Sequence, residues 1–182
     1  MNDTPTPSFE FTCSCCGERH DWFPSFAWEW PIEALYVPQH EWPSRVALTS
    51  ETCVIDGVAF FLRGCVLIPI KGVLEPFIWG MWPRIDEASF HAYVRGLNAR
   101  SLVESRIAGR LGSVPPGYRD AQLDVWVNIK PIGTRPEIQL IDTEHPFAVD
   151  QQRGISVEQV QEVAERLLHP APKPRRRWWP FH

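Results

Sequence analysis

A cluster of cysteines near the start of the chain limits which folds the chain can adopt. Three of the five cysteines and one histidine lie within Cys13–His20. Cys13 and Cys16 have the C-x-x-C spacing that lets one tight turn direct two sulfurs at one metal ion. Gly17 follows the second cysteine, where a metal-binding turn often requires a positive φ. The chain must therefore form a turn here, and zinc is the candidate ion for its centre.

The residues before the cluster predict a short strand. Apolar and polar side chains alternate over Phe9 to Thr12, as they do on a strand that buries one face. A strand that leads directly into a cysteine turn is the usual beginning of a zinc ribbon. We therefore expect a zinc-ribbon-like cysteine knuckle over residues 9–23.

The candidate zinc ligands are Cys13, Cys16 and His20. They leave one position of a tetrahedral site open, and that position belongs to a distant residue, to Cys15 or to water. A ribbon normally has a second C-x-x-C pair, which this chain lacks, so a cluster of metal-free thiols is the alternative. The sequence thus predicts a structural zinc site without completing it.

Composition places the chain among ordinary globular proteins. With 44% hydrophobic and 22% charged residues among 182, a packed core is possible. The net charge of −4 argues against a protein that coats nucleic acid, and the 18 prolines favour short elements. No apolar run approaches the ~20 residues that span a bilayer. Because the start of the chain lacks a signal-peptide pattern and the clustered cysteines suit a reducing compartment, we expect a cytoplasmic protein.

The apolar patterns predict an α+β fold. Ser156 is the expected N-cap of the clearest helix. The order is strands, helices, strands and a final helix, which favours a mainly antiparallel sheet with a few packed helices and the N-terminal knuckle. Strands are predicted over residues 45–48, 52–55, 58–62, 64–70, 75–82, 123–129 and 137–141, and helices over residues 31–36, 86–97, 101–111 and 157–168.

The strongest hairpin pattern is Asp56-Gly57 between two apolar runs. A two-residue turn at this point pairs Cys53 with Phe60. Cys65 lies an odd number of positions beyond Phe60, so an uninterrupted strand directs it to the opposite face from Cys53. The two cysteines are therefore not expected to share one ion, and a place in the core is preferred for each.

Domain boundaries follow from shifts in composition. We divide the chain into a loose N-terminus of residues 1–8, one α+β domain of residues 9–169 and a tail of residues 170–182. The tail is rich in proline, arginine and tryptophan, so we expect an extended docking segment for anionic lipid or nucleic acid. Self-docking and an unselected extension are the alternatives, and a protein partner is also expected for the domain.

Several blocks in order along the chain resemble one known family. They are Phe11–His20, Cys53–Gly57, Phe60–Gly64, Phe77–Gly80, Gly133–Ile138, Asp142–Pro146 and Gln152–Ile155. Together they resemble a bacterial family classed as domain of unknown function 2199, over nearly the whole chain except the tail. The resemblance implies a bacterial protein and assigns it no activity. The chain departs from the family's pattern at Asn128-Ile129, where a Val-His pair is expected, so no role for a histidine carries over there.

Two functions of different classes are compatible with the sequence. The leading one is a cytosolic binding or interaction module that structural zinc stabilises. The alternative is a metal- or thiol-dependent enzyme, in which an open metal position or a low-pKa thiolate at Cys15 or Cys16 acts beside His145 and Asp142. The ordinary role of Asp142 is to organise a turn. Because the P-loop, G-x-S-x-G and H-E-x-x-H motifs are absent, the module is favoured.

Two further groups of residues have alternative roles. Arg63 and Arg135 either bind an anion or form ion pairs, and ion pairs are preferred, with Asp56, Glu75 and Glu137 as the candidate partners. The tryptophans either form a stacking surface for a ligand or belong to the core. Trp79 and Trp126 are expected in the core, whereas both roles stay open for Trp22, Trp28 and Trp30.

Overall fold

The structure is a computed structural model that describes residues 10–20 and 25–169. Its strands are β1 (Phe11–Thr12), β2 (Arg19–His20), β3 (Ser25–Ala27), β4 (Val46–Leu48), β5 (Thr52–Ile55), β6 (Ala59–Leu62), β7 (Gly64–Ile68), β8 (Phe77–Met81), β9 (Arg84–Ile85), β10 (Ser105–Leu111), β11 (Leu123–Ile129) and β12 (Glu137–Leu140). Its helices are η1 (Ile32–Tyr36), η2 (Gln39–Glu41), α1 (Trp42–Arg45), α2 (Glu87–Asn98), α3 (Pro146–Arg153) and α4 (Val157–Leu168). The fold is therefore α+β, as predicted. The predictions for residues 1–8 and 170–182 lie outside the described residues.

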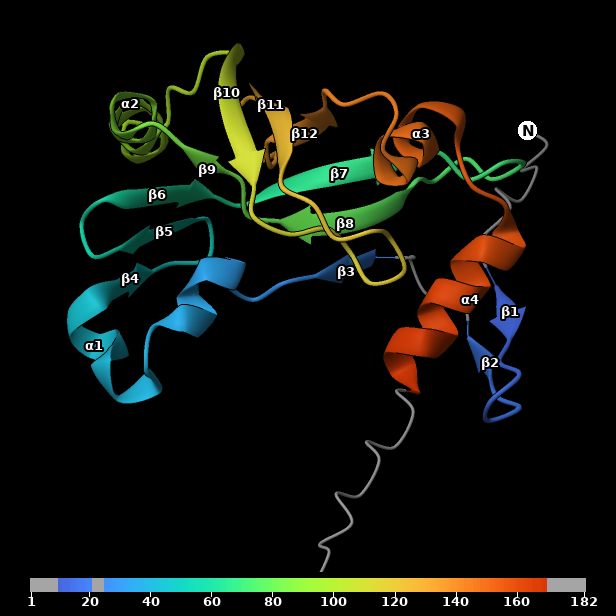
Figure 1. Cartoon of the computed structure of the whole chain (residues 1–182). Coiled ribbons are helices and arrows are strands. Elements are labelled where there is room, and N and C mark those ends of the chain that lie inside the picture. Colours follow the sequence, from blue (N-terminus) through green and yellow to red (C-terminus); the bar gives the residue numbers. More distant parts are fainter. Residues whose placement is uncertain (1–9, 21–24, 170–182) are drawn as a thin grey trace, which may run out of the picture.

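The large sheet is mixed and curled, which corrects the expectation of a mainly antiparallel sheet (Figure 1). Its ten strands have the order β3-β8-β7-β12-β11-β10-β9-β6-β5-β4. Two parallel pairings mix it, because β3 joins β8 and β12 joins β7 in parallel. Both pairings connect segments far apart in the sequence, so local patterns of hydrophobicity contain no information about them.

One long hairpin explains the curl. β6 continues into β7 and pairs with β8 and β9 in a single register, from Phe60 opposite Ile85 to Ile68 opposite Phe77. On its outer edge β7 pairs with β12, and on its outer edge β9 pairs with β10. β11 lies between and pairs with both β10 and β12. Following the pairings from β7 through β12, β11, β10 and β9 leads back to the same hairpin. The sheet thus encloses its core instead of lying flat.

Alternation along the strands assigns side chains to two cores. Phe60, Leu62, Val66 and Ile68 face the main core, which also receives buried side chains from α3 and α4. Phe61 points the other way, into a second cluster with Cys53 and Trp82. Because β6 is covered on both faces, its sequence is an unbroken apolar run.

The hairpin of β5 and β6 turns where the sequence predicts, but in a different register. Cys53 pairs with Phe61 and not with Phe60, because Val58 joins Asp56 and Gly57 in the loop. Asp56 and Gly57 both have positive φ, and Arg45 forms two hydrogen bonds of 2.6 Å to the Asp56 carboxylate. The expectation that Cys53 and Cys65 face opposite sides is therefore wrong, since it depended on Phe60. The core role of Cys53 is confirmed by its complete burial.

The predicted helix over residues 101–111 is wrong, because residues 105–111 form the strand β10. Its apolar residues fit a helical repeat, but Ile107 and Leu111 also fit the period of two that β10 adopts. Gly109 allows β9 to approach closely, since a Cβ at that position would lie 3.1 Å from the carbonyl oxygen of Arg84.

No helix in the described part of the chain is long and apolar enough to cross a membrane.

Helix α4 begins and ends as the sequence predicts, and it positions the candidate site. The Ser156 side chain accepts from the backbone N–H of Gln159, whose own side chain accepts from the N–H of Ser156. This capping box satisfies two N–H groups that the first turn leaves unpaired. Val160 and Ala164 are fully buried, so this face attaches the helix to the main core.

Replacing the cap should destabilise the protein measurably. We expect Ser156→Ala to lower the free energy of unfolding by ~1 kcal/mol, because an N-terminal amide loses its partner. At this chain length, such a loss lowers the melting temperature by about 2–4 °C. Ser156→Asp should retain most of the stability, since aspartate is an equally good N-cap. Thermal denaturation of the three proteins side by side tests this, and equal melting of the alanine variant would contradict the assignment.

Candidate metal centre

The cysteine cluster forms the turn of a short hairpin. Phe11 pairs with His20 across β1 and β2, and the backbone N–H of Cys13 donates to the Glu18 carbonyl at 2.8 Å. The N–H of Gly17 donates to the Cys13 carbonyl at 2.9 Å, and Gly17 has a φ of +74°. This conformation favours glycine, as its place after the second cysteine predicts. The ring centroids of Phe11 and His20 lie 5.1 Å apart, so Phe11 supports the imidazole from one side.

Four side chains bring their ligand atoms together at this turn. They are Cys13, Cys16, His20 and His169, and all four ligand atoms lie within 4.8 Å of one another. Three of them are the ligands predicted from the sequence, and His169 is the distant fourth residue that the sequence did not identify. Cys15 and the other cysteines, Cys53 and Cys65, are not members of this group.

The group has the composition and nearly the dimensions of a zinc site. Zinc bonds of about 2.3 Å to sulfur and about 2.0–2.1 Å to nitrogen place the ligand atoms of a tetrahedral site about 3.3–3.8 Å apart. The Cys16 Sγ and the His20 Nε2 already lie 3.8 Å apart. Small movements of exposed side chains would close the remaining distance, because Cys16 and His169 are on the surface. The four residues therefore fit a zinc ion with two cysteine and two histidine ligands.

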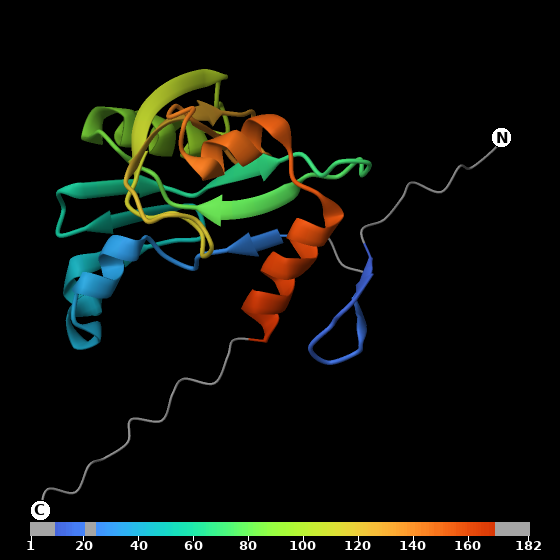
Figure 2. The ribbon, with the colours of Figure 1, turned by 45° about the vertical axis from the view of Figure 1, so that its right-hand side comes forward.

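Helix α4 holds the hairpin through one polar face. Gln161, Glu165 and His169 follow one another at four-residue spacing, so they lie on the same side of the helix. The Glu165 carboxylate accepts from the backbone N–H and the hydroxyl of Ser14, at 2.5 and 2.7 Å, and Gln161 donates to the Thr12 carbonyl at 3.1 Å. Figures 1 and 2 show β1 and β2 beside α4 in both views. The same face therefore positions both the turn and the imidazole of His169.

The electrostatic environment favours a thiolate at Cys13. Burial opposes ionisation of Cys13, but hydrogen bonds from the backbone N–H groups of Cys16 and Cys15 outweigh it, so its pKa lies below the usual thiol value. Partial loss of hydration raises the pKa of Cys15, although its side chain is exposed. The Glu18 N–H lowers the pKa of Cys16, yet partial loss of hydration and the neighbouring Cys13 leave it raised overall. Of the three thiols in the turn, only Cys13 therefore has a lowered pKa, which does not favour the low-pKa thiolate proposed at Cys15 or Cys16.

Glu165 is fixed in its charged form by its hydrogen-bond donors. The Gln161 side chain, the Ser14 N–H and the Ser14 hydroxyl together lower the pKa of Glu165 to about 2. A carboxylate next to the site also favours a cation there. Ser14 of the cysteine turn and Glu165 of α4 thus form hydrogen bonds that do not depend on a metal ion.

His145 and Asp142, the proposed partners of an enzyme site, have structural roles. His145 is 1% exposed and caps α3, since its Nδ1 accepts from the backbone N–H of Phe147 at 3.2 Å. Its Nε2 lies 2.9 Å from the Arg119 carbonyl, so that nitrogen carries the proton. Asp142 accepts from the N–H groups of Glu144 and His145 and organises the turn before the helix. Both ring nitrogens of His145 are occupied, and neither residue belongs to the metal group.

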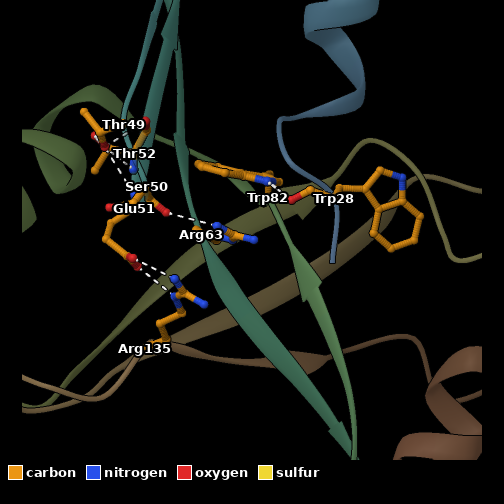
Figure 3. A network of polar contacts seen from close by, with 8 residues as sticks. All are labelled: Trp28, Thr49, Ser50, Glu51, Thr52, Arg63, Trp82 and Arg135. Atoms are coloured by element: carbon orange, nitrogen blue, oxygen red, sulfur yellow. Dashed lines mark hydrogen bonds and ion pairs between the residues drawn. The ribbon is translucent and has the colours of Figure 1, made fainter. Parts of the chain in front are cut away.

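The two arginines form contacts other than the predicted ones (Figure 3). Arg135 pairs with Glu51 through hydrogen bonds of 2.9 and 3.0 Å, and not with Asp56, Glu75 or Glu137. Arg63 lies 5.6 Å from the centre of the Trp82 ring and donates to the Ser50 carbonyl at 3.4 Å. The preference for an ion pair is thus confirmed for Arg135, with a partner that the sequence did not indicate.

The tryptophans divide between the core and the surface. Trp79 is 2% exposed, as expected for a core residue. Trp126 is half-buried beneath Arg106, whose guanidinium lies 5.5 Å from the ring, so its assignment to the core is wrong. It alternates with the buried Val125 and Val127 and therefore points to the outer face of β11. Trp28 and Trp30 pack against the second core cluster, and Trp22 lies outside the described residues.

Comparison with known proteins identifies one family. The family described as "Uncharacterized protein conserved in bacteria (DUF2199)" matches residues 12–155 of the chain. The matched range contains Cys13, Cys16 and His20 but ends before α4 and His169. No curated protein and no solved structure matches the chain. The fourth member of the metal group is therefore an inference from the structure alone.

Proposed function

The chain belongs to the bacterial family DUF2199, and we propose that this member is a binding module whose N-terminal hairpin is fixed by one structural zinc ion. Cys13, Cys16 and His20 of the hairpin and His169 at the end of α4 are the proposed ligands. The ion would join two segments from opposite ends of the described chain. Its role would be to keep the hairpin against the helix.

The observation that carries this proposal is the convergence of four protein ligand atoms within 4.8 Å. A catalytic zinc ion keeps one coordination position for water or substrate, whereas a structural ion takes four protein ligands. A complete Cys₂His₂ set therefore supports a structural role. The enzyme alternative also required His145 and Asp142, but His145 caps α3 and Asp142 organises the turn before that helix.

The extent and location of the module belong to the same proposal. We treat residues 9–169 as one domain, because Phe11 and Cys13 of the hairpin share a core cluster with Val160 and Ala164 of α4. We propose the cytoplasm as its location, because its five cysteines are free and a reducing compartment keeps them so. A protein partner remains part of the proposal for the domain, and contacts of the tail with lipid or nucleic acid remain a prediction from its sequence.

His169→Ala tests the one proposed ligand that the sequence did not identify. Structural zinc sites bind with about 10–16 kcal/mol, so one of four ligands contributes on the order of 3 kcal/mol, or about 100-fold in affinity. We therefore expect the zinc affinity of the variant to fall about 100-fold in a titration against a chromophoric chelator. His40→Ala is the matched control, because His40 is exposed and outside the metal group. Equal zinc affinity in the two variants would remove His169 from the site.

A further inference from the structure

Two adjoining cavities lie along α2, away from the candidate metal centre. One, of about 380 Å³, lies between α2 and β10 and is lined by Ala92, Gly96, Ile107 and Ile129 among others. The second, of about 450 Å³, extends to Glu51, Thr134 and Arg135. Tyr93 and Leu102 line both cavities. Their volumes fall in the range of small-molecule sites, which is about 300–1,000 Å³.

Tyr93 is the residue that marks these cavities as a binding site. Its side chain is only 6% exposed, yet its hydroxyl has no hydrogen-bond partner among the residues that the structure describes. The hydroxyl is not enclosed, and Tyr93 lines both cavities, so the hydroxyl is available to donate to or accept from a molecule bound there. Tyrosine suits such a position because it combines an apolar ring with one polar group.

The second cavity has one polar end and one apolar side. Arg135 binds Glu51 through its Nε and Nη2, and its other N–H groups are left for a ligand (Figure 3). Tyr93 is within electrostatic reach of both residues, since each contributes to its raised pKa, for which burial is the main cause. Leu97 and Leu102 supply the apolar side. Tyrosine and arginine donors therefore converge beside an apolar surface.

The charges around the polar end favour an anion. Burial raises the pKa of Cys65, and the charges of Arg135, Arg63, Glu51 and Glu137 also act on its thiol, so these four groups lie near one residue. Glu137 is already paired with Lys130 at 3.1 Å, and Glu51 with Arg135. Arg63 has no carboxylate partner within the described chain, so one positive charge remains near the polar end, although Arg63 itself lines neither cavity.

We propose that these cavities bind a small carboxylate with an apolar body. The carboxylate would accept hydrogen bonds from Arg135 and Tyr93, and the apolar body would lie along Leu97 and Leu102 toward Ile107. This inference is independent of the zinc site, so either can fail without the other. It also gives the proposed binding module a ligand class.

Titrating the full-length protein with 4-phenylbutanoate tests the site, with octanoate as the aliphatic counterpart and 4-phenylbutanamide as the neutral analogue. We expect saturable amide shifts in ¹H–¹⁵N spectra near Gly96 and Thr134, with a Kd on the order of 1 mM for such small ligands. At least one carboxylate should bind about 10-fold more tightly than the amide, because charge-assisted hydrogen bonds are the stronger ones. Comparing the two carboxylates decides between an aromatic and an aliphatic body.

Variants separate the site from non-specific binding. Arg135→Gln should weaken carboxylate binding about 10-fold and Tyr93→Phe about 5-fold. Arg110→Gln is the matched control, because Arg110 is also in an exposed ion pair but lies outside both cavities. Ala92→Phe should block the first cavity from an exposed helix position, whereas Arg95→Phe on the same helix should not.

Two results would overturn this proposal. One is the absence of saturable shifts with both carboxylates up to about 20 mM, well above the Kd expected for a site of this size. The other is equal binding of acid and amide, or equal weakening by Arg135→Gln and Arg110→Gln. The spectra themselves report whether each variant is folded, so loss of structure cannot be mistaken for loss of the site.

Discussion

Cys13→Ser should abolish the zinc-dependent part of the protein's stability. A ligand at 1,000 times its Kd stabilises the folded state by about 4 kcal/mol. For a chain of this size, that corresponds to about 8–16 °C in melting temperature. We therefore expect the zinc-loaded protein to melt that much higher than the chelated protein, and the variant to melt at the same temperature with or without zinc. Differential scanning calorimetry with and without chelator measures both.

Cys15→Ser is the matched control for this experiment. Cys15 lies in the same turn and is exposed, but it is outside the metal group. The variant should keep the full stabilisation by zinc. If Cys15→Ser loses that stabilisation and Cys13→Ser keeps it, the ligand assignment is wrong. If neither chelation nor either variant changes the melting temperature, the hairpin is held without a metal.

His145→Ala should be strongly destabilising although it removes no functional group from the proposed module. The change removes the N-cap of α3, which contributes about 1 kcal/mol. It also leaves the part-buried Arg119 carbonyl without its donor, at a cost of about 1–3 kcal/mol. We expect a total loss of about 3 kcal/mol, which lowers the melting temperature by about 6–12 °C.

The comparison with His145→Asn assigns the loss to its causes. Asparagine is a good N-cap, so this variant should recover the capping part of the loss and not the bond to Arg119. Both variants should bind zinc with unchanged affinity, because His145 is outside the metal group. A stable His145→Ala protein would contradict the capping role and return His145 to the candidates for chemistry.

Local patterns predicted the elements that local interactions form. The capping box at Ser156, the apolar stripe of α4 and the turn at Asp56-Gly57 all depend on residues within a few positions of one another. The C-x-x-C spacing and Gly17 likewise predicted the turn that brings Cys13 and Cys16 together. In each case the interacting residues are close in sequence, so local preference and the final fold agree.

The errors concern register and long-range pairing. The register of β5 against β6 depends on whether Val58 belongs to the loop, and a shift of one residue reverses the faces. β10 was predicted as a helix because Ile107 and Leu111 fit both periods, and its neighbours in the sheet decide between them. The parallel pairings of β3 and β12 join distant segments, so no local pattern could show that the sheet is mixed.

His169 is the most informative omission from the predicted site. A C-x-x-C turn followed by one histidine requires a fourth ligand, but the sequence does not say which distant residue approaches the turn. Its position four residues after Glu165 is meaningful only once Glu165 is known to bind Ser14, which is 151 residues away in sequence. The proposed fourth ligand could therefore be recognised only from the packing of α4 against the hairpin.

X-ray absorption at the zinc edge tests the proposed Cys₂His₂ site by identifying the atoms bound to the metal. The measurement uses the full chain loaded with one equivalent of zinc and freed of excess metal. Our assignment predicts two sulfur neighbours at about 2.3 Å and two imidazole nitrogens at about 2.0–2.1 Å. The His169→Ala variant should show one imidazole replaced by a light atom. Failure to retain one zinc ion per chain, or a shell of oxygen and nitrogen without sulfur, would contradict the claim.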